Sequence, residues 1–152
     1  MLKTYATFRE IQHDLQHGIL TCQDLVHHHL DNIKKKSHLN VFLSVYAEEA
    51  LARATEIDKR ISRGTGGKLA GLVVGLKDVL AYKDHPLQGS SKILDGFISQ
   101  FNGTAVQRLL DEDAIIIGRQ NCDEFAMGSS NENSAFGPVL NDADNTRVPG
   151  GS

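Results

Sequence analysis

Apolar positions at helical spacing dominate the first sixty residues. Thr7 and Glu10 match the capping box that starts a helix, and Gly18 follows as a stop signal. A second helix is expected to begin at Thr21 and a third at about Ala47. The predicted apolar stripes are Phe8, Ile11 and Leu15; Leu25, Val26, Leu30 and Ile33; and Ala50, Leu51, Ala54, Ile57 and Ile61.

The pattern then changes to short, nearly continuous apolar runs. Residues 41–45 form a short segment with β-branched residues, which predicts a strand or an extended connector. Residues 69–76 and 114–118 are predicted to be buried strands. Thr104 is expected to cap a helix between the last two, after an irregular stretch over 81–103. A strand, a helix and a strand in this order predict a parallel crossover in an α/β sheet.

Composition narrows the class of protein. The 152 residues carry a net charge of −3 with both signs interspersed and no basic stripe, which argues against direct nucleic-acid binding by this segment. Cys22 and Cys122 match no metal spacing and are predicted to be free thiols in a reducing compartment. Because no signal peptide or membrane-length apolar run is visible, we expect a cytoplasmic location without membrane contact. Consecutive histidines at 27–29 point in different directions on a helix, so no metal site is predicted.

Lys77 is the sharpest interior candidate for chemistry. It ends an apolar run in Gly75-Leu76-Lys77-Asp78, where desolvation favours the neutral amine that can act as a base near pH 7. The alternative is a lysine that emerges at the sheet edge and pairs with Asp78. Ser152 follows a Pro-Gly-Gly turn, and a lysine with a glycine-flanked serine suggests acyl transfer in which an amine moves the protons.

Two further segments contain residue types that could carry chemistry. Gly66-Gly67-Lys68 departs from the phosphate-loop pattern, since Ser62 stands in place of the first glycine and Leu69 in place of the hydroxyl residue. Residues 123–130, Asp-Glu-Phe-Ala-Met-Gly-Ser-Ser, mix acids, an aromatic ring and small hydroxyls. A helix-capping turn explains this block as well as a site does, and its two acids are expected to be structural.

Taken together, these segments resemble the amidase-signature family, and within it the A subunits of tRNA-dependent amidotransferases. The resemblance rests on ordered motifs over essentially the whole chain: residues 69–78, 114–118, 123–138 and 147–152. It implies an α/β fold, a mixed sheet flanked by helices, of which this chain is the N-terminal portion. We expect a helical segment over 1–63 and the first part of the α/β domain over 64–152.

The resemblance also implies a Ser–cis-Ser–Lys triad. Lys77 would be the lysine base and Ser152 the bridging serine, while the nucleophilic serine would lie beyond residue 152. The 152-residue chain alone is therefore expected to be inactive. A cis peptide before a non-proline residue costs about 3–4 kcal/mol, so the surrounding structure must enforce it. Because Ser152 is the last residue of this chain, the Gly151–Ser152 bond is not expected to be held cis. Met127, Gly128 and Ser129 would contact substrate.

The implied function is that of the glutaminase component of an amidotransferase. It would hydrolyse glutamine and supply ammonia for ATP-dependent amidation of misacylated Glu-tRNA(Gln) or Asp-tRNA(Asn), in a heterotrimer with the B and C subunits. No cofactor is expected in this chain, because ATP and Mg²⁺ would act through a partner chain. Two alternatives stay open: another amidase-signature hydrolase of small amides, and a non-catalytic interaction module whose helical N-terminus binds a small partner chain.

Overall fold

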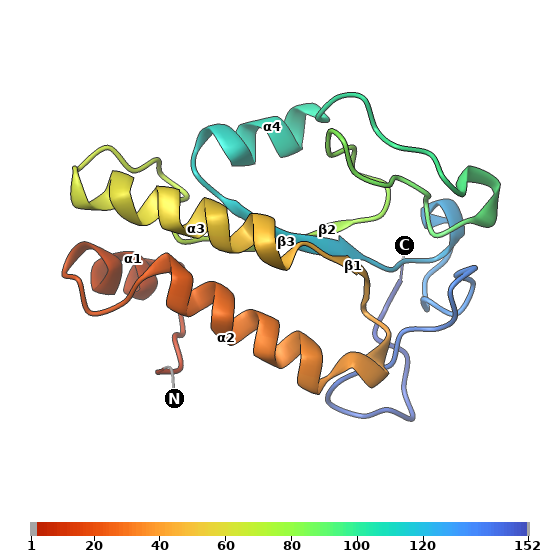
Figure 1. Ribbon diagram of the computed structural model, residues 1–152. Helices are drawn as coiled ribbons and strands as arrows, with labels where there is room; N and C mark the ends of the chain where they lie inside the picture. The colour runs from red at the N-terminus through yellow and green to blue at the C-terminus, as the bar shows by residue number, and fades with distance from the viewer. Residues whose placement is uncertain (1–2, 152) are drawn as a thin grey trace. The chain divides into compact units, whose positions relative to one another are not determined.

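The structure, a computed structural model, describes residues 3–151 (Figure 1). Its elements are α1 (Phe8–Gln16), α2 (Cys22–Lys35), β1 (Phe42–Val45), α3 (Ala47–Ser62), β2 (Val73–Lys77), α4 (Thr104–Asp111) and β3 (Ile115–Gln120), with short 3-10 turns at Ser37–Leu39, Lys92–Leu94 and Glu124–Ala126. The chain forms two compact units. The first comprises Met1–Lys35, Tyr46–Val74 and Gln107–Ile117, and the second comprises Lys36–Val45, Gly75–Val106 and Gly118–Ser152.

The first unit contains the three predicted helices, and local capping explains where two of them start. Thr7 Oγ1 accepts a hydrogen bond from the Glu10 amide at 3.4 Å ahead of α1. Thr21 and Asp24 cap α2 reciprocally, each side chain accepting from the other's amide at 3.0 Å. The helix α3 packs against α1 and α2, and it lies beside α2 in Figure 1. The predicted helices are therefore confirmed, and α3 ends at Ser62, next to the predicted boundary at residue 63. That residues 1–63 form a segment of their own stays a prediction.

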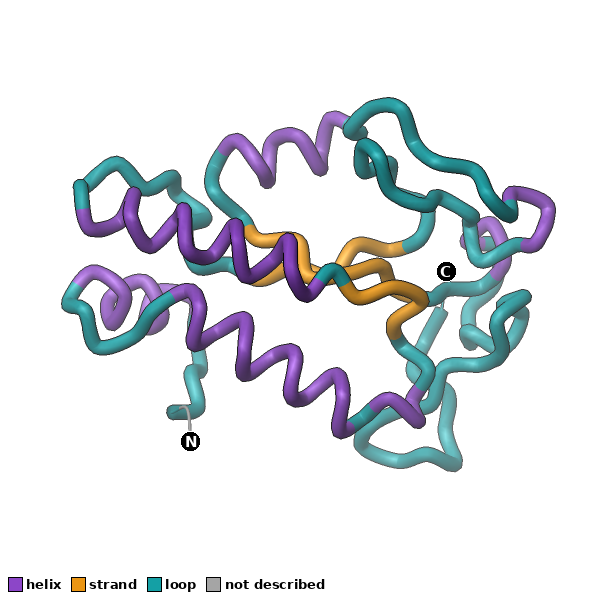
Figure 2. Tube along the Cα trace, in the orientation of Figure 1, coloured by secondary structure: helices purple, strands orange, loops and turns teal. Residues whose placement is uncertain are grey.

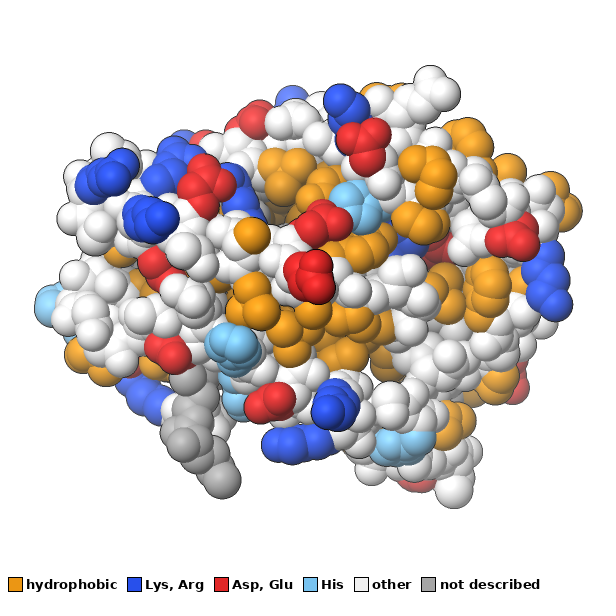
Figure 3. All heavy atoms as spheres, viewed as in Figure 1, with side chains coloured by type: hydrophobic (Ala, Val, Ile, Leu, Met, Phe, Trp, Pro, Cys, Tyr) orange, Lys and Arg blue, Asp and Glu red, His pale blue; other side chains and the backbone are white. Residues whose placement is uncertain are grey.

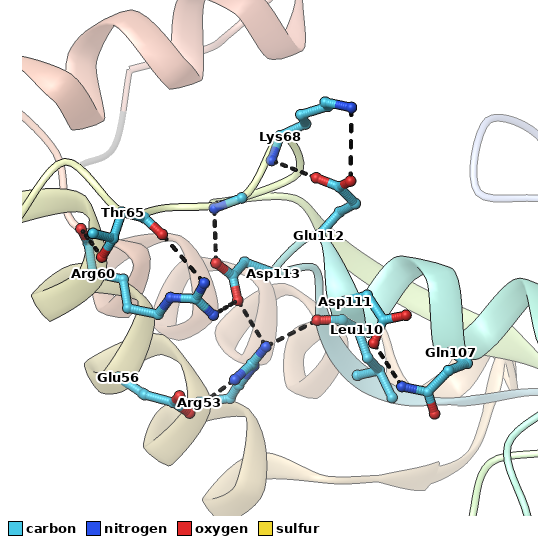
Figure 4. Close-up of polar contacts among 11 residues, drawn as sticks. Arg53, Glu56, Arg60, Thr65, Lys68, Gln107, Leu110, Asp111, Glu112 and Asp113 are labelled. Carbon is cyan, nitrogen blue, oxygen red and sulfur yellow. Dashed lines mark hydrogen bonds and ion pairs between the residues drawn. The ribbon is translucent and has the colours of Figure 1, made fainter.

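A buried carboxylate ties α3 to the glycine loop that follows it (Figure 4). Asp113 has no exposed surface, and its Oδ1 accepts from Arg53 at 2.9 Å and from Arg60 at 2.6 Å. Its Oδ2 accepts from the amide of Gly67 at 2.8 Å, while the amide of Lys68 donates to the Glu112 carboxylate at 2.9 Å. Because the amides of Gly67 and Lys68 donate to these carboxylates, they are not available to an anion, which agrees with the departure of this segment from the phosphate-loop pattern.

The three strands form a mixed sheet in the order β1-β3-β2. The strand β1 runs antiparallel to β3, with Phe42 opposite Gln120 and Val45 opposite Gly118. The direction of β2 follows from two hydrogen bonds at its ends: Ile115 N donates to Leu72 O at 2.9 Å, and Asp78 N donates to Gln120 O at 3.0 Å. Residue numbers rise together along both strands, so β2 and β3 are parallel. The α4 crossover between them confirms the predicted α/β arrangement.

Two sequence predictions need correction. The apolar run at 69–76 is not one buried strand, since residues 68–71 form a turn and the strand begins at Val73. Gly71 makes the turn possible with φ +90°, and a Cβ there would collide with the Leu15 side chain. Within β2 only Leu76 is buried, because β2 lies at the edge of the sheet whereas β3 occupies its centre. In addition, α4 begins at Thr104, which is thus its first helical residue and not the residue before it.

The second unit is held together largely by loops. Residues 127–151 contain no helix or strand, as the loop colour in Figure 2 shows. Its interior is unusually polar, and its buried polar residues are Asp78, Ser90, Ser91, Ser99, Arg119, Asn121, Asp123 and Asn131. Such groups are stable inside a protein only when they are hydrogen-bonded, so this unit depends on its polar contacts.

The surface and the cysteines agree with the composition. Charged side chains of both signs are interspersed on the face shown in Figure 3. Cys22 and Cys122 are buried free thiols, as predicted, and burial raises the pKa of the Cys22 thiol. In residues 3–151, none of the helices has the length and apolar character needed to cross a membrane.

Candidate active site

Lys77 lines a cavity of about 490 Å³ that lies wholly within the second unit. It is the last residue of β2 and is half-buried. The glycines of the Pro-Gly-Gly turn, Gly150 and Gly151, line the same cavity. Within residues 3–151, no hydrogen bond or ion pair engages the Lys77 ammonium group. The fold thus brings the lysine and the glycine turn, 73 positions or more apart in the sequence, to one opening.

Asp78 does not pair with Lys77, so the alternative of a lysine held by its neighbour is not what the structure shows. The Asp78 carboxylate is fully buried, and its Oδ1 lies 3.4 Å from Nη1 of the equally buried Arg119. It also accepts from the backbone amides of Gln88 at 3.2 Å and Ser90 at 2.7 Å. Because successive side chains at the end of a strand point to opposite sides, Lys77 is left facing the cavity.

The Gln88–Ser91 segment is hydrogen-bonded both to Asp78, which follows β2, and to the loop that follows β3. Ser90 Oγ accepts from the amide of Cys122 at 3.0 Å, and Ser90 O accepts from the amide of Ala135 at 2.9 Å. Next to it, the Ser91 hydroxyl donates to Glu124 at 2.6 Å. These contacts fix the loop after β3 relative to Asp78, and therefore to the strand that ends at Lys77.

The three residues predicted to contact substrate, Met127, Gly128 and Ser129, do not line the cavity that Lys77 lines. Met127 is 82% exposed, Gly128 packs against the Asp123 carboxyl group, and Ser129 is exposed. The residues that line the Lys77 cavity do not include any of them, although the backbone of Ser129 touches Gly151. Their role in substrate binding stays a prediction.

Ser152 lies outside the described residues, and so does the predicted state of the Gly151–Ser152 bond. The glycine that precedes it is closely surrounded: a Cβ on Gly151 would collide with Asp123 and with the backbone between Ser129 and Ser130. The bridging role of Ser152 therefore stays a prediction as well.

Several cavity residues escaped the sequence analysis. Asn121 and Asn131 line the cavity, and the buried Oδ1 of Asn131 has no hydrogen-bond partner within residues 3–151. Arg119 is almost fully buried, and so is Asp123, which was expected from the sequence to be structural. Asn121 and Asn131 stand in loop sequence rich in small polar residues, and Arg119 stands at the end of an apolar strand. No spacing rule distinguishes them from solvated side chains, so only the packing reveals them.

The side chains that could ligate a metal are dispersed over residues 3–151. Among residues 3–151, no group of three or more His, Cys, Asp or Glu side chains is placed to hold an ion, and the histidines at 27–29 are part of α2. The polar side chains that line the cavity carry the Lys77 amine, the Asp142 carboxylate, the Cys122 thiol and the amides of Gln120, Asn121 and Asn131. These groups can transfer protons and form hydrogen bonds to a polar substrate.

Comparison with known proteins supports the resemblance that the sequence motifs indicated. Two curated relatives, from Chlorobium phaeobacteroides (strain BS1) and Chlorobaculum tepidum, are each named as the A subunit of glutamyl-tRNA(Gln) amidotransferase. They are 46% identical over 149 residues and 47% identical over 146 residues. These alignments cover 97% and 95% of this chain but only 31% and 30% of the relatives. The chain therefore spans less than a third of the length of these relatives.

Solved structures agree on the fold. A chain from a vestigial protein complex, described as revealing the evolutionary origins of an s-triazine catabolic enzyme, superposes with a TM-score of 0.88 at 33% identity, over 94% of this chain and 32% of that chain. A crystal structure of an amidase gives a TM-score of 0.86 at 29% identity, over 94% of this chain and 33% of that one. The peptide amidase of Stenotrophomonas maltophilia gives 0.84 at 26% identity, over 93% and 31%.

The family itself is decided by a match over most of the chain. Residues 24–152 fit the family model described as amidase, which includes Lys77, the loop after β3 and the glycine turn. The order of motifs, the mixed sheet and the cavity that unites them are consistent with this match. The chain belongs to the amidase family.

Proposed function

We propose that this chain is the N-terminal portion of the A subunit of a tRNA-dependent amidotransferase. In that protein it would hydrolyse glutamine and supply ammonia for ATP-dependent amidation of misacylated Glu-tRNA(Gln) or Asp-tRNA(Asn). The identity to curated A subunits, 46% over 97% of this chain, supports the assignment. The single structural observation behind it is that Lys77 and the Gly150-Gly151 turn line one cavity.

The proposed chemistry uses Lys77 as the base. Its neutral amine takes a proton from the hydroxyl of Ser152, which in turn takes the proton of a nucleophilic serine located beyond residue 152. The nucleophile attacks the glutamine side-chain carbonyl, and the proton taken up by Lys77 returns through Ser152 to the leaving nitrogen as collapse of the adduct breaks the carbon–nitrogen bond and releases ammonia. Water then hydrolyses the acyl-enzyme to glutamate. The setting of Lys77 supports this role, because its side chain lines the cavity together with the glycine turn that precedes Ser152.

Other parts of the reaction are assigned to partners. The B and C subunits would complete a heterotrimer, and ATP and Mg²⁺ would act in one of these partner chains. Misacylated tRNA would bind the complex without direct contact with this segment, in keeping with the net charge of −3. Met127, Gly128 and Ser129 would contact glutamine, and a cytoplasmic location follows from the role in protein biosynthesis.

The test is ammonia release from glutamine by the complete gene product purified with the B and C subunits. Lys77→Ala is expected to lower kcat by about 10²–10⁴-fold, the range for a lost general base. Lys68→Ala is the matched control, because Lys68 is 87% exposed and its Nζ lies 3.8 Å from Glu112 in a surface pair. Full turnover in Lys77→Ala would rule out the lysine as base. Ammonia release by the 152-residue chain alone would show that the nucleophile does not lie beyond residue 152.

A second candidate is a hydrolase of small free amides. The similarity to the amidase structures at 29% and 26% identity favours it. Such an enzyme would turn over small amides at least as fast as glutamine and would not respond to the B and C subunits or to misacylated tRNA. Stimulation of glutamine hydrolysis by the tRNA complex would exclude it.

A further inference from the structure

The loop after β3 adopts a backbone that side-chain-bearing residues avoid. Phe125, Ala126 and Asn131 have φ angles of 52°, 59° and 61°, within a span of seven residues. Each left-handed residue other than glycine is disfavoured, and such strain persists only where the surrounding structure enforces it. Something must therefore hold this loop in place.

The Asp123 carboxylate is the group at the centre of the loop. It has no exposed surface, although an isolated buried carboxylate is costly. Its Oδ2 accepts from the amide of Asn131 at 3.0 Å and its Oδ1 from the amide of Asn133 at 3.3 Å. The amide of Glu124 donates to the carbonyl of Asn133 at 3.2 Å. The carboxylate thus closes the loop on itself through Asn131, one of the three left-handed residues, and through Asn133.

The same carboxyl group lies against the glycine turn. A Cβ added to Gly128 would collide with the Asp123 carboxyl, and a Cβ added to Gly151 would collide with Asp123 Oδ2. The Gly151 position is also bounded by the carbonyl carbon of Ser129 and the amide nitrogen of Ser130. Asp123 therefore contacts the loop on one side and the turn on the other, and that turn lines the cavity with Lys77.

We propose that Asp123 is a positioning residue: its buried carboxylate sets the distance between the 128–130 backbone and Gly151, and so the position of Gly151 in the cavity that Lys77 lines. The proposal rests on the proposed function, in which Ser152 exchanges a proton with Lys77. Asp123 itself exchanges no proton and touches no reacting atom. Its contribution is geometric, because a small displacement of a reacting group can reduce the rate strongly.

The chain offers a matched control in Asp58. This carboxylate also accepts two backbone amides, from Cys22 at 2.7 Å and from Gln23 at 3.3 Å, but at the start of α2 in the other compact unit. Asp123→Asn and Asp58→Asn therefore remove comparable hydrogen bonds. Only the first change disturbs the contact with Gly151.

The first measurement is made on the 152-residue chain by ¹⁵N relaxation. Wild-type Gly151 and Ser130 are expected in the rigid range of order parameters, about 0.85, and Asp123→Asn is expected to lower them below about 0.6. Asp58→Asn is expected to leave both unchanged. A flexible Gly151 in the wild type, or a rigid one in Asp123→Asn, would overturn the proposal without reference to catalysis.

The second measurement is glutamine hydrolysis by the complete gene product with its partner subunits. Asp123→Asn is expected to lower kcat by about 10–100-fold while KM changes less than about threefold, and Asp58→Asn to leave both near wild type. Gly151→Ala, whose methyl group would collide with the same carboxyl, is the second variant and is expected to lose kcat similarly. A kcat in either site variant equal to that of Asp58→Asn would refute the positioning role. Absence of glutaminase in the wild type would instead defeat the proposed function and leave the relaxation result standing.

Discussion

Replacing Asp78 with alanine removes one half of an ion pair that has almost no contact with solvent. The side chains of Asp78 and Arg119 are 0% and 1% exposed, and their nearest charged atoms lie 3.4 Å apart. The carboxylate also accepts two backbone amides of the segment that joins the ends of β2 and β3. The change therefore removes the Asp78 carboxylate from Arg119, which keeps its hydrogen bond to the Leu80 carbonyl at 3.1 Å, and takes the acceptor from the amides of Gln88 and Ser90.

The size of the effect follows from this burial. Two unit charges at 3.4 Å attract each other by about 5 kcal/mol at an effective dielectric constant of about 20. Measured losses on breaking a buried pair are about 3–5 kcal/mol, because the remaining charge stays desolvated. Since a domain of this size is stable by about 5–15 kcal/mol, Asp78→Ala is expected to remove a large part of the folding free energy.

Urea unfolding followed by circular dichroism measures this loss. At a slope of about 2 kcal/mol per molar urea, the midpoint should fall by about 2 M. Asp144→Ala is the control, because Asp144 pairs with Arg147 at the surface and is expected to cost less than about 1 kcal/mol. The double variant Asp78→Ala/Arg119→Met should recover part of the loss, since neither charge of the pair remains. A single-variant cost as small as that of Asp144→Ala, or strictly additive costs in the double variant, would refute the reasoning.

Two further predictions concern the first unit. The hydrogen bond from Lys3 at 2.9 Å, with one from His13, holds the pKa of Asp14 at about 2. Asp14 therefore contributes stability above its unfolded pKa of about 3.9 that is lost as the pH falls toward 2. The difference in unfolding free energy between wild type and Asp14→Asn should be largest at pH 7 and smaller at pH 3, and a difference constant over this range would contradict the shift. Gly67→Ala should destabilise by about 1–3 kcal/mol, because its Cβ would meet the Glu112 carbonyl at 2.5 Å. Gly66→Ala, whose Cβ meets the movable Ile61 side chain at 3.2 Å, is the control, and equal costs would count against the clash.

Local rules account for the elements that the sequence predicted well. The Thr7 and Thr21 caps and the apolar stripes act within one or two turns of helix, so the starts of α1 and α2 and the extent of α3 could be derived without the fold. The central strand β3 was found for a similar reason, because a strand covered on both faces has a continuous apolar run. The same rule predicted β2 to start too early, because residues 69–71 of its apolar run belong to a turn packed on α1.

For the candidate site too, some features could be predicted from the sequence and others depend on the tertiary structure. Lys77 could be singled out because it interrupts an apolar run, and the motif order over the chain indicated the amidase family. That Lys77 faces a cavity shared with Gly150 and Gly151, while Asp78 turns away to Arg119, depends on contacts between residues far apart in the chain. Asp123 and Asn131 acquire their roles only through burial, because the cost of an unpaired polar group arises when packing removes water from it.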